Sequence, residues 1–108
     1  DCSHGTQRDR WSRVLDRGFN VGGTGFVHFA AGTPGGQTDR ATGMRPGSST
    51  VGVYFDLKQA LADGMEVHLA EDGTVLARGF DKAVSSRYFL RATDLSSGEV
   101  LWQRAAEA

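Results

Sequence analysis

The chain has 108 residues, of which 39% are hydrophobic and 23% are charged. This is the composition of one globular domain, so we treat residues 1–108 as a single domain and do not expect a disordered protein. The formal net charge of −1 excludes a surface that binds nucleic acid by charge alone, because that requires an excess of lysine and arginine. No apolar run reaches the length of a membrane span, so we expect no membrane partner.

The cysteine content points to a reducing compartment. Cys2 is the only cysteine, so an intrachain disulfide is impossible. We therefore expect an intracellular protein, cytoplasmic, nuclear or both. The abrupt start at Asp1, close to a candidate histidine, is typical of a domain cut from a longer protein.

The first predicted element is a short amphipathic helix over 7–17. The His4-Gly5-Thr6 turn would open it, with Thr6 as the N-cap and Asp9 in the first turn. Apolar residues then recur at i, i+3, i+4 spacing, namely Trp11, Val14 and Leu15. Gly18 is a typical residue to end such a helix.

The rest of the chain predicts short strands and a second helix. Strands are expected over 26–31, 50–56, 65–70, 74–77, 88–92 and 99–103. A second helix is expected over 57–63, and a glycine-rich loop over 32–49. Gly22-Gly23-Thr24-Gly25 reads as a turn, because no helix follows it as a dinucleotide fingerprint requires. We expect an α+β domain with a mainly antiparallel sheet of about six strands and two short helices.

Three residues are candidates for chemistry, and each also has an ordinary interpretation. His4 could contact a sugar hydroxyl beside a glycine that admits a ligand, or simply be a polar residue near a terminus. His28, in an apolar strand, could contact a ligand or be a hydrogen-bonded core residue. Arg45 could stabilise negative charge on a phosphate or be a surface residue of a loop.

An ordered set of motifs resembles the NAD-binding, ADP-ribosyltransferase-like lobe of the RNA 2′-phosphotransferases. The main segments are His4-Gly5-Thr6, Val27-His28-Phe29-Ala30, Gly43-Met44-Arg45, Val53-Tyr54-Phe55-Asp56 and Ala60-Leu61-Ala62-Asp63-Gly64. Asp72-Gly73-Thr74-Val75-Leu76, Arg87-Tyr88-Phe89 and the segment 98–102 continue the likeness. The resemblance covers nearly the whole chain, and its specificity comes from the order of the motifs.

The resemblance implies a two-step reaction that removes the splice-junction 2′-phosphate from tRNA. The phosphate attacks C1″ of the nicotinamide ribose of NAD, and nicotinamide leaves. The ribose 2″-hydroxyl of the ADP-ribosylated RNA then attacks the phosphate. The products are ADP-ribose 1″,2″-cyclic phosphate and RNA with a free 2′-hydroxyl.

The resemblance also implies roles for individual residues. Cofactor-binding residues would be His4, Gly5, Thr6, His28, Phe29 and Val75. His4 would contact the adenosine-side ribose, Gly5 the nicotinamide amide through its backbone, and His28 the nicotinamide ribose. Val75 would stand where mono-ADP-ribosyltransferases often have glutamate. Arg45 and His28 would be catalytic, with Arg45 serving the phosphate-expelling step. No metal site is expected.

Two departures from the family pattern leave other functions open. Thr24-Gly25-Phe26 stands where the family usually has an arginine and a histidine. The family's amino-terminal lobe, which helps to hold the 2′-phosphorylated RNA, has no counterpart in this sequence. A divergent, toxin-like ADP-ribosyltransferase that modifies RNA or protein directly is one alternative. A non-catalytic module that binds NAD or ADP-ribose is the other.

Overall fold

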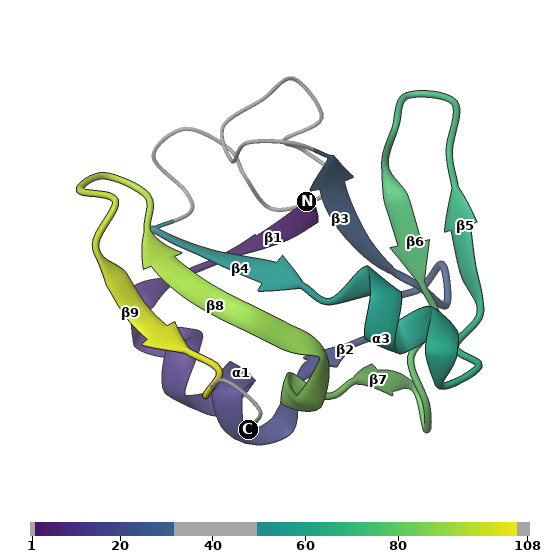
Figure 1. Cartoon of the computed structure of the whole chain (residues 1–108), viewed down its shortest axis with the longest axis horizontal. Coiled ribbons are helices and arrows are strands. Elements are labelled where there is room, and N and C mark those ends of the chain that lie inside the picture. The colour runs from purple at the N-terminus through teal and green to yellow at the C-terminus, as the bar shows by residue number, and fades with distance from the viewer. Residues whose placement is uncertain (1, 32–49, 106–108) are drawn as a thin grey trace.

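The computed structural model describes residues 2–31 and 50–105, and the expected loop over 32–49 lies outside them. The helical segments are η1 (Arg8–Arg10), α1 (Trp11–Arg17), α3 (Leu57–Ala62) and η2 (Ser86–Tyr88). The strands are β1 (Cys2–Thr6), β2 (Phe19–Asn20), β3 (Val27–Ala31), β4 (Val51–Phe55), β5 (Val67–Leu69), β6 (Val75–Ala77), β7 (Ala83–Val84), β8 (Phe89–Asp94) and β9 (Val100–Gln103) (Figure 1).

Seven strands form one sheet, in the order β5-β6-β3-β1-β4-β8-β9, and every neighbouring pair is antiparallel. β2 and β7 form a separate two-stranded antiparallel sheet. The expected α+β class with a mainly antiparallel sheet is therefore confirmed. The described residues contain more strands than expected, because two-residue strands such as β2 and β7 show no alternation in sequence.

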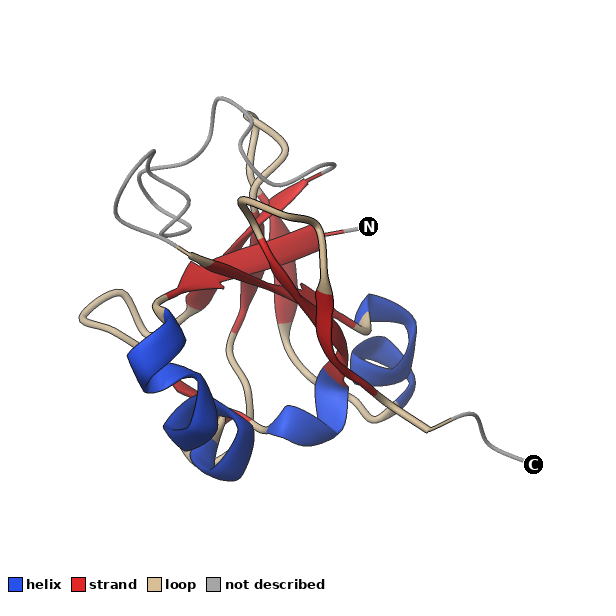
Figure 2. Ribbon diagram, turned by 90° about the vertical axis from the view of Figure 1, so that its left-hand side faces the viewer, coloured by secondary structure: helices blue, strands red, loops and turns tan. Residues whose placement is uncertain are grey.

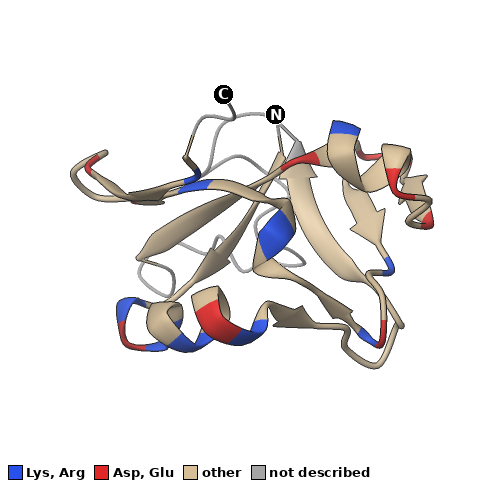
Figure 3. Cartoon of the chain, turned by 60° about the horizontal axis from the view of Figure 1, so that its bottom comes forward, with Lys and Arg blue, Asp and Glu red and all other residues tan. Residues whose placement is uncertain are grey.

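The helices α1 and α3 lie apart from each other, with strands of the main sheet between them (Figure 2 and Figure 3). The core packed against the sheet includes the fully buried side chains of Phe29, Phe89, Val51, Val53 and Val84. Phe29 stacks on Phe55 with ring centroids 4.4 Å apart. Trp11 connects α1 to the same core, because its ring centroid lies 6.3 Å from that of Phe89. Each large aromatic side chain buries about 150–250 Å² of surface, so this aromatic cluster is a main source of stability.

The position of β1 corrects the prediction for the start of the chain. His4, Gly5 and Thr6 lie in a central strand that pairs along its whole length with β4, and not in a turn that opens a helix. Helical structure begins at Arg8, after Gln7, so Thr6 as the N-cap is wrong. The reason is long-range, because β1 is held by partner strands that are distant in sequence and no local propensity reports them.

The ends of the helices agree better with the sequence. Gly18 follows α1 with a φ of 76°, as expected for a glycine that ends a helix. Asp56 caps α3, since its Oδ1 accepts a hydrogen bond of 3.1 Å from the Gln59 backbone N–H. The hairpin predicted around residues 71–73 is also confirmed, because β5 and β6 pair directly across that turn.

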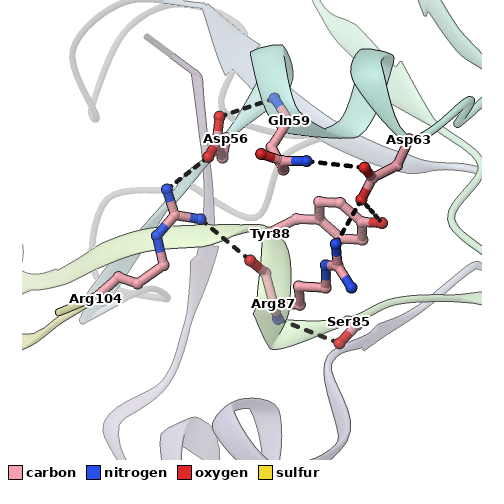
Figure 4. Close-up of polar contacts among 7 residues, drawn as sticks. All are labelled: Asp56, Gln59, Asp63, Ser85, Arg87, Tyr88 and Arg104. Atoms are coloured by element: carbon pink, nitrogen blue, oxygen red, sulfur yellow. Dashed lines mark hydrogen bonds and ion pairs between the residues drawn. The ribbon is translucent and has the colours of Figure 1, made fainter. Parts of the chain in front are cut away.

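A network of side chains ties α3 to η2 and to the end of β9 (Figure 4). Arg104 Nη2 donates to Asp56 Oδ2 at 2.6 Å, and Arg104 Nη1 donates to the Arg87 carbonyl at 3.2 Å. At the other end of α3, Asp63 Oδ2 accepts from the Tyr88 hydroxyl at 2.7 Å and pairs with Arg87 at 3.2 Å. The hydrogen bond from Tyr88 is the main reason that the pKa of Asp63 is lowered. We assign this network a structural role.

Candidate functional site

The main sheet opens between β1 and β3. The two strands pair only at Cys2–Ala31 and Ser3–Ala30, whereas β1 pairs with β4 over five residues. Beyond Ser3 the strands diverge like the arms of a V (Figure 1). From His4 to Thr6, β1 thus has no ladder partner on its β3 side among the described residues. This opening is where the structure forms a cleft.

The cleft consists of two adjoining hollows. One, of about 290 Å³, lies between His4, His28 and the loop 20–26. The other, of about 760 Å³, runs from His4 and Gly5 along one side of α1. His4, Phe19 and Asn20 line both hollows, so the two hollows adjoin at these residues. Their volumes are in the range of pockets that bind cofactors and other small molecules.

His4 is fixed in the cleft in one orientation and one tautomer. Its ring packs edge-on against Phe19, with centroids 4.6 Å apart, and lies 5.9 Å from Phe29. Its Nδ1 lies 2.7 Å from the His28 carbonyl oxygen. A carbonyl can only accept, so Nδ1 carries the proton and Nε2 of the neutral ring is an acceptor. Burial lowers the pKa of His4, which keeps the ring neutral near pH 7.

His28 makes two contacts in the cleft. Its backbone carbonyl bonds to His4, and its side chain bonds to the loop 20–26. Its Nε2 lies 3.2 Å from the Thr24 hydroxyl, which in turn lies 3.4 Å from the Phe26 backbone N–H. Thr24 therefore connects the loop to the ring of His28. The two histidines, 24 positions apart in the sequence, line the same hollow.

The structure brings together some of the predicted site residues and separates others. His4, Gly5, Thr6 and His28 all line the cleft. Phe29 is fully buried behind His4, where it supports the ring.

Val75 and Arg45 stand apart from that group. Val75 pairs with Phe29 across the β3–β6 ladder and lines a different hollow, of about 390 Å³, with Cys2 and Leu69. Arg45 lies outside the described residues. The roles of these two residues stay predictions.

Sequence reasoning did not single out the arginines along the cleft. Arg10, Arg13 and Arg17 follow the wall formed by η1 and α1, together with Asp9. Basic and acidic residues are interleaved along these two elements (Figure 3). Arginines spaced three and four residues apart lie on one face of a helix. This spacing is visible in the sequence and could have identified them as a row of cations beside a site.

Metal ligands, the cysteine and the length of the helices bear on other kinds of site in the described residues. Residues 2–31 and 50–105 contain no cluster of three or more histidine, cysteine or acidic side chains placed to hold a metal ion. Burial raises the pKa of the Cys2 thiol to about 11, so this thiol is protonated and unreactive near neutral pH. None of the described helices is long and apolar enough to cross a membrane.

Comparison with known proteins identifies the family. Residues 1–79 match the model of the RNA 2'-phosphotransferase, Tpt1 / KptA family. A Schizosaccharomyces pombe protein provisionally named tRNA 2'-phosphotransferase is 34% identical over 91% of this chain and 26% of its own length. The tRNA 2'-phosphotransferase 1 of Danio rerio is 30% identical over 88% of this chain and 42% of its own length. The tRNA 2'-phosphotransferase 1 of Homo sapiens is 32% identical over 85% of this chain and 36% of its own length. This chain therefore belongs to the RNA 2'-phosphotransferase, Tpt1 / KptA family.

Proposed function

We propose that this chain is the NAD-binding part of an enzyme that removes the splice-junction 2′-phosphate of tRNA. The family match and the names of the relatives support the reaction class. The observation that carries the proposal is the pair His4 and His28, which meet in a cleft of suitable size. The chain spans 26% to 42% of the length of these relatives. In this proposal, residues beyond the present sequence, in an amino-terminal lobe, hold most of the RNA.

The proposed roles follow from the geometry of the cleft. His4 Nε2 would accept a hydrogen bond from a ribose hydroxyl, because Nδ1 is already committed to His28. The backbone at Gly5, in the part of β1 that lacks a β3 partner, would pair with the nicotinamide carboxamide. His28 would face the nicotinamide ribose, and Arg10 and Arg13 would contact the pyrophosphate. Holding the reacting groups in line is the main requirement of the first step.

NAD binding by the 108-residue chain tests this proposal. Calorimetry or ligand-observed NMR should detect weak binding, and His4→Ala should reduce the affinity about tenfold, the cost of one lost buried hydrogen bond. His68→Ala is a matched control, because His68 is exposed, bonds to Glu66 and does not line the cleft. Equal affinity of the His4→Ala and unchanged chains would remove His4 from the site.

A direct ADP-ribosyltransferase remains the second candidate function. Thr24 and Phe26 occupy the positions where the family usually has basic and imidazole side chains, and Thr24 instead bonds to His28. Such an enzyme would leave ADP-ribose attached to its target and release no cyclic phosphate. Product analysis of the full-length protein with NAD and 2′-phosphorylated RNA distinguishes the two reactions. A protein that binds NAD without turnover would be the non-catalytic module.

The lowered pKa of His4 predicts that acid weakens the fold. The folded state holds the neutral ring, whereas the unfolded chain binds a proton near the ordinary pKa of about 6.5. The stabilisation by the neutral ring is thus complete above that pKa and is lost as the pH falls below it. We expect the thermal midpoint to decrease between pH 7.5 and 5.5, and His4→Gln to remove most of this decrease. An equal decrease in both proteins would assign it to other groups.

A further inference from the structure

We infer that a further hollow beside the cleft, here called the side pocket, binds one nucleotide of the single-stranded RNA substrate. The side pocket lies between the loop 20–25 and the segment 78–82 and has a volume of about 760 Å³. Phe80 would stack on the base, while Arg78 and Lys82 would contact the phosphates. The inference rests on the proposed function, since it presupposes an RNA substrate.

The side pocket adjoins the candidate NAD cleft. Asn20, Gly22 and Gly23 line both, so only the loop 20–25 separates the two spaces. An RNA strand with its reacting phosphate near His28 would therefore pass its neighbouring nucleotide over this loop. The volume accommodates a base with its sugar.

The walls of the side pocket combine an aromatic ring with positive charge. The Phe80 side chain is 44% exposed, although it is a large apolar residue, and its ring lies 6.2 Å from the Tyr88 ring. Arg78 lies over the Phe26 ring at 5.5 Å and pairs with Glu66 at 3.6 Å, a surface ion pair that holds the guanidinium only weakly. Lys82 adds a second cation, against the single carboxylate of Asp81. Aromatic rings beside cations are the usual means of binding single-stranded nucleic acid.

The backbone of the segment 78–82 holds Lys82 in a costly conformation. Asp81 and Lys82 are consecutive non-glycine residues with φ values of 55° and 65°. They are the two central residues of a tight turn closed by hydrogen bonds between Phe80 and Ala83. Such a turn normally takes Asn-Gly. The Lys82 carbonyl also accepts from the Val21 N–H at 2.9 Å, which ties the two walls together. A lysine kept where glycine would be more stable is consistent with a function for its side chain.

The substitution Lys82→Gly separates binding from folding. It removes the cation and relieves the positive φ, so the variant should unfold at a higher temperature than the unchanged chain. Its affinity for a five-nucleotide single-stranded RNA, followed by amide chemical shifts in NMR, should nevertheless fall about threefold or more at low salt. The slope of log affinity against log salt should also become shallower by about 0.7, the value for one phosphate contact on a single strand.

Two further variants complete the test. Phe80→Leu keeps apolar volume but removes the stacking surface, so affinity should fall about fivefold or more. Lys58→Ala removes one charge from an exposed position on α3 outside the side pocket and should leave the affinity and its salt slope unchanged. In the unchanged chain, the RNA should shift amide signals of residues 22–25 and 78–82.

Several results would overturn the inference. These are RNA-induced shifts confined to other residues, no detectable RNA binding, or an effect of Lys82→Gly no larger than that of Lys58→Ala. NAD titrations of the same variants keep this failure distinct from failure of the proposed function. A chain that binds NAD but does not bind RNA in the side pocket would refute only the present inference. A chain that does not bind NAD would count against the proposed function itself.

Discussion

Gly18→Ala should destabilise the folded chain by about 3 kcal/mol or more, because the added methyl group has no room and the backbone conformation strongly favours glycine. Gly18 has a φ of 76° and a ψ of −169°, a conformation that is essentially restricted to glycine. A Cβ atom there would lie 2.2 Å from the Val84 carbonyl oxygen, which belongs to the backbone of β7 and cannot turn aside. The substitution would therefore force α1 and the small β2–β7 sheet apart. Urea unfolding followed by circular dichroism measures the loss.

Gly23→Ala is the matched control for this experiment. Gly23 has no positive φ, and a Cβ atom there would meet nothing within 4 Å. Its substitution should change the free energy of unfolding by about 0.5 kcal/mol or less. Similar losses in the two variants would show that Gly18 does not lie against the Val84 carbonyl as described.

Arg45→Ala should have the largest effect on the proposed reaction. In the full-length protein with NAD and 2′-phosphorylated RNA, we expect the second step to slow about 100-fold or more, the cost of removing one charged group that stabilises developing negative charge. The first step should slow much less, because loss of nicotinamide does not place new negative charge on the phosphate. ADP-ribosylated RNA should therefore accumulate, and gel electrophoresis or mass spectrometry would detect it.

Arg45→Lys helps to interpret this result. Lysine keeps the charge but cannot bind a phosphate with two parallel hydrogen bonds, so partial recovery of the second step would support a phosphate contact. Substrate RNA that stays wholly unreacted in Arg45→Ala, with no intermediate, would contradict the assignment. Arg45 would then act before nicotinamide leaves.

The elements that the sequence predicted well are those with local signals. α3 follows an aspartate that caps it, and α1 ends at a glycine with positive φ. β1 was not predictable in this way. It contains Ser3, His4 and Gly5, shows no alternation, and is a strand because distant β4 pairs with it throughout. Its central position in the sheet therefore had to come from the structure.

The site was predictable in part, for a similar reason. The resemblance selected His4 and His28, but not the bond between them, which runs from a side chain to the backbone of a residue 24 positions away. Backbone acceptors leave no mark on residue identity, so this contact had no sequence signal. The bond between Thr24 and His28 was also hidden, because this chain departs from the family pattern at that position.

The two-pair ladder between β1 and β3 has a consequence for how folding and binding are linked. The half of β1 without a β3 neighbour pairs with β4 on one side only, so its other side is an unpaired strand edge. This edge lies within the sheet, where neighbouring strands are normally joined by hydrogen bonds. A molecule that supplies hydrogen bonds along this edge takes the place of the missing strand segment. Filling the cleft and completing the sheet are then the same event, so the ligand adds its binding free energy directly to the stability of the fold.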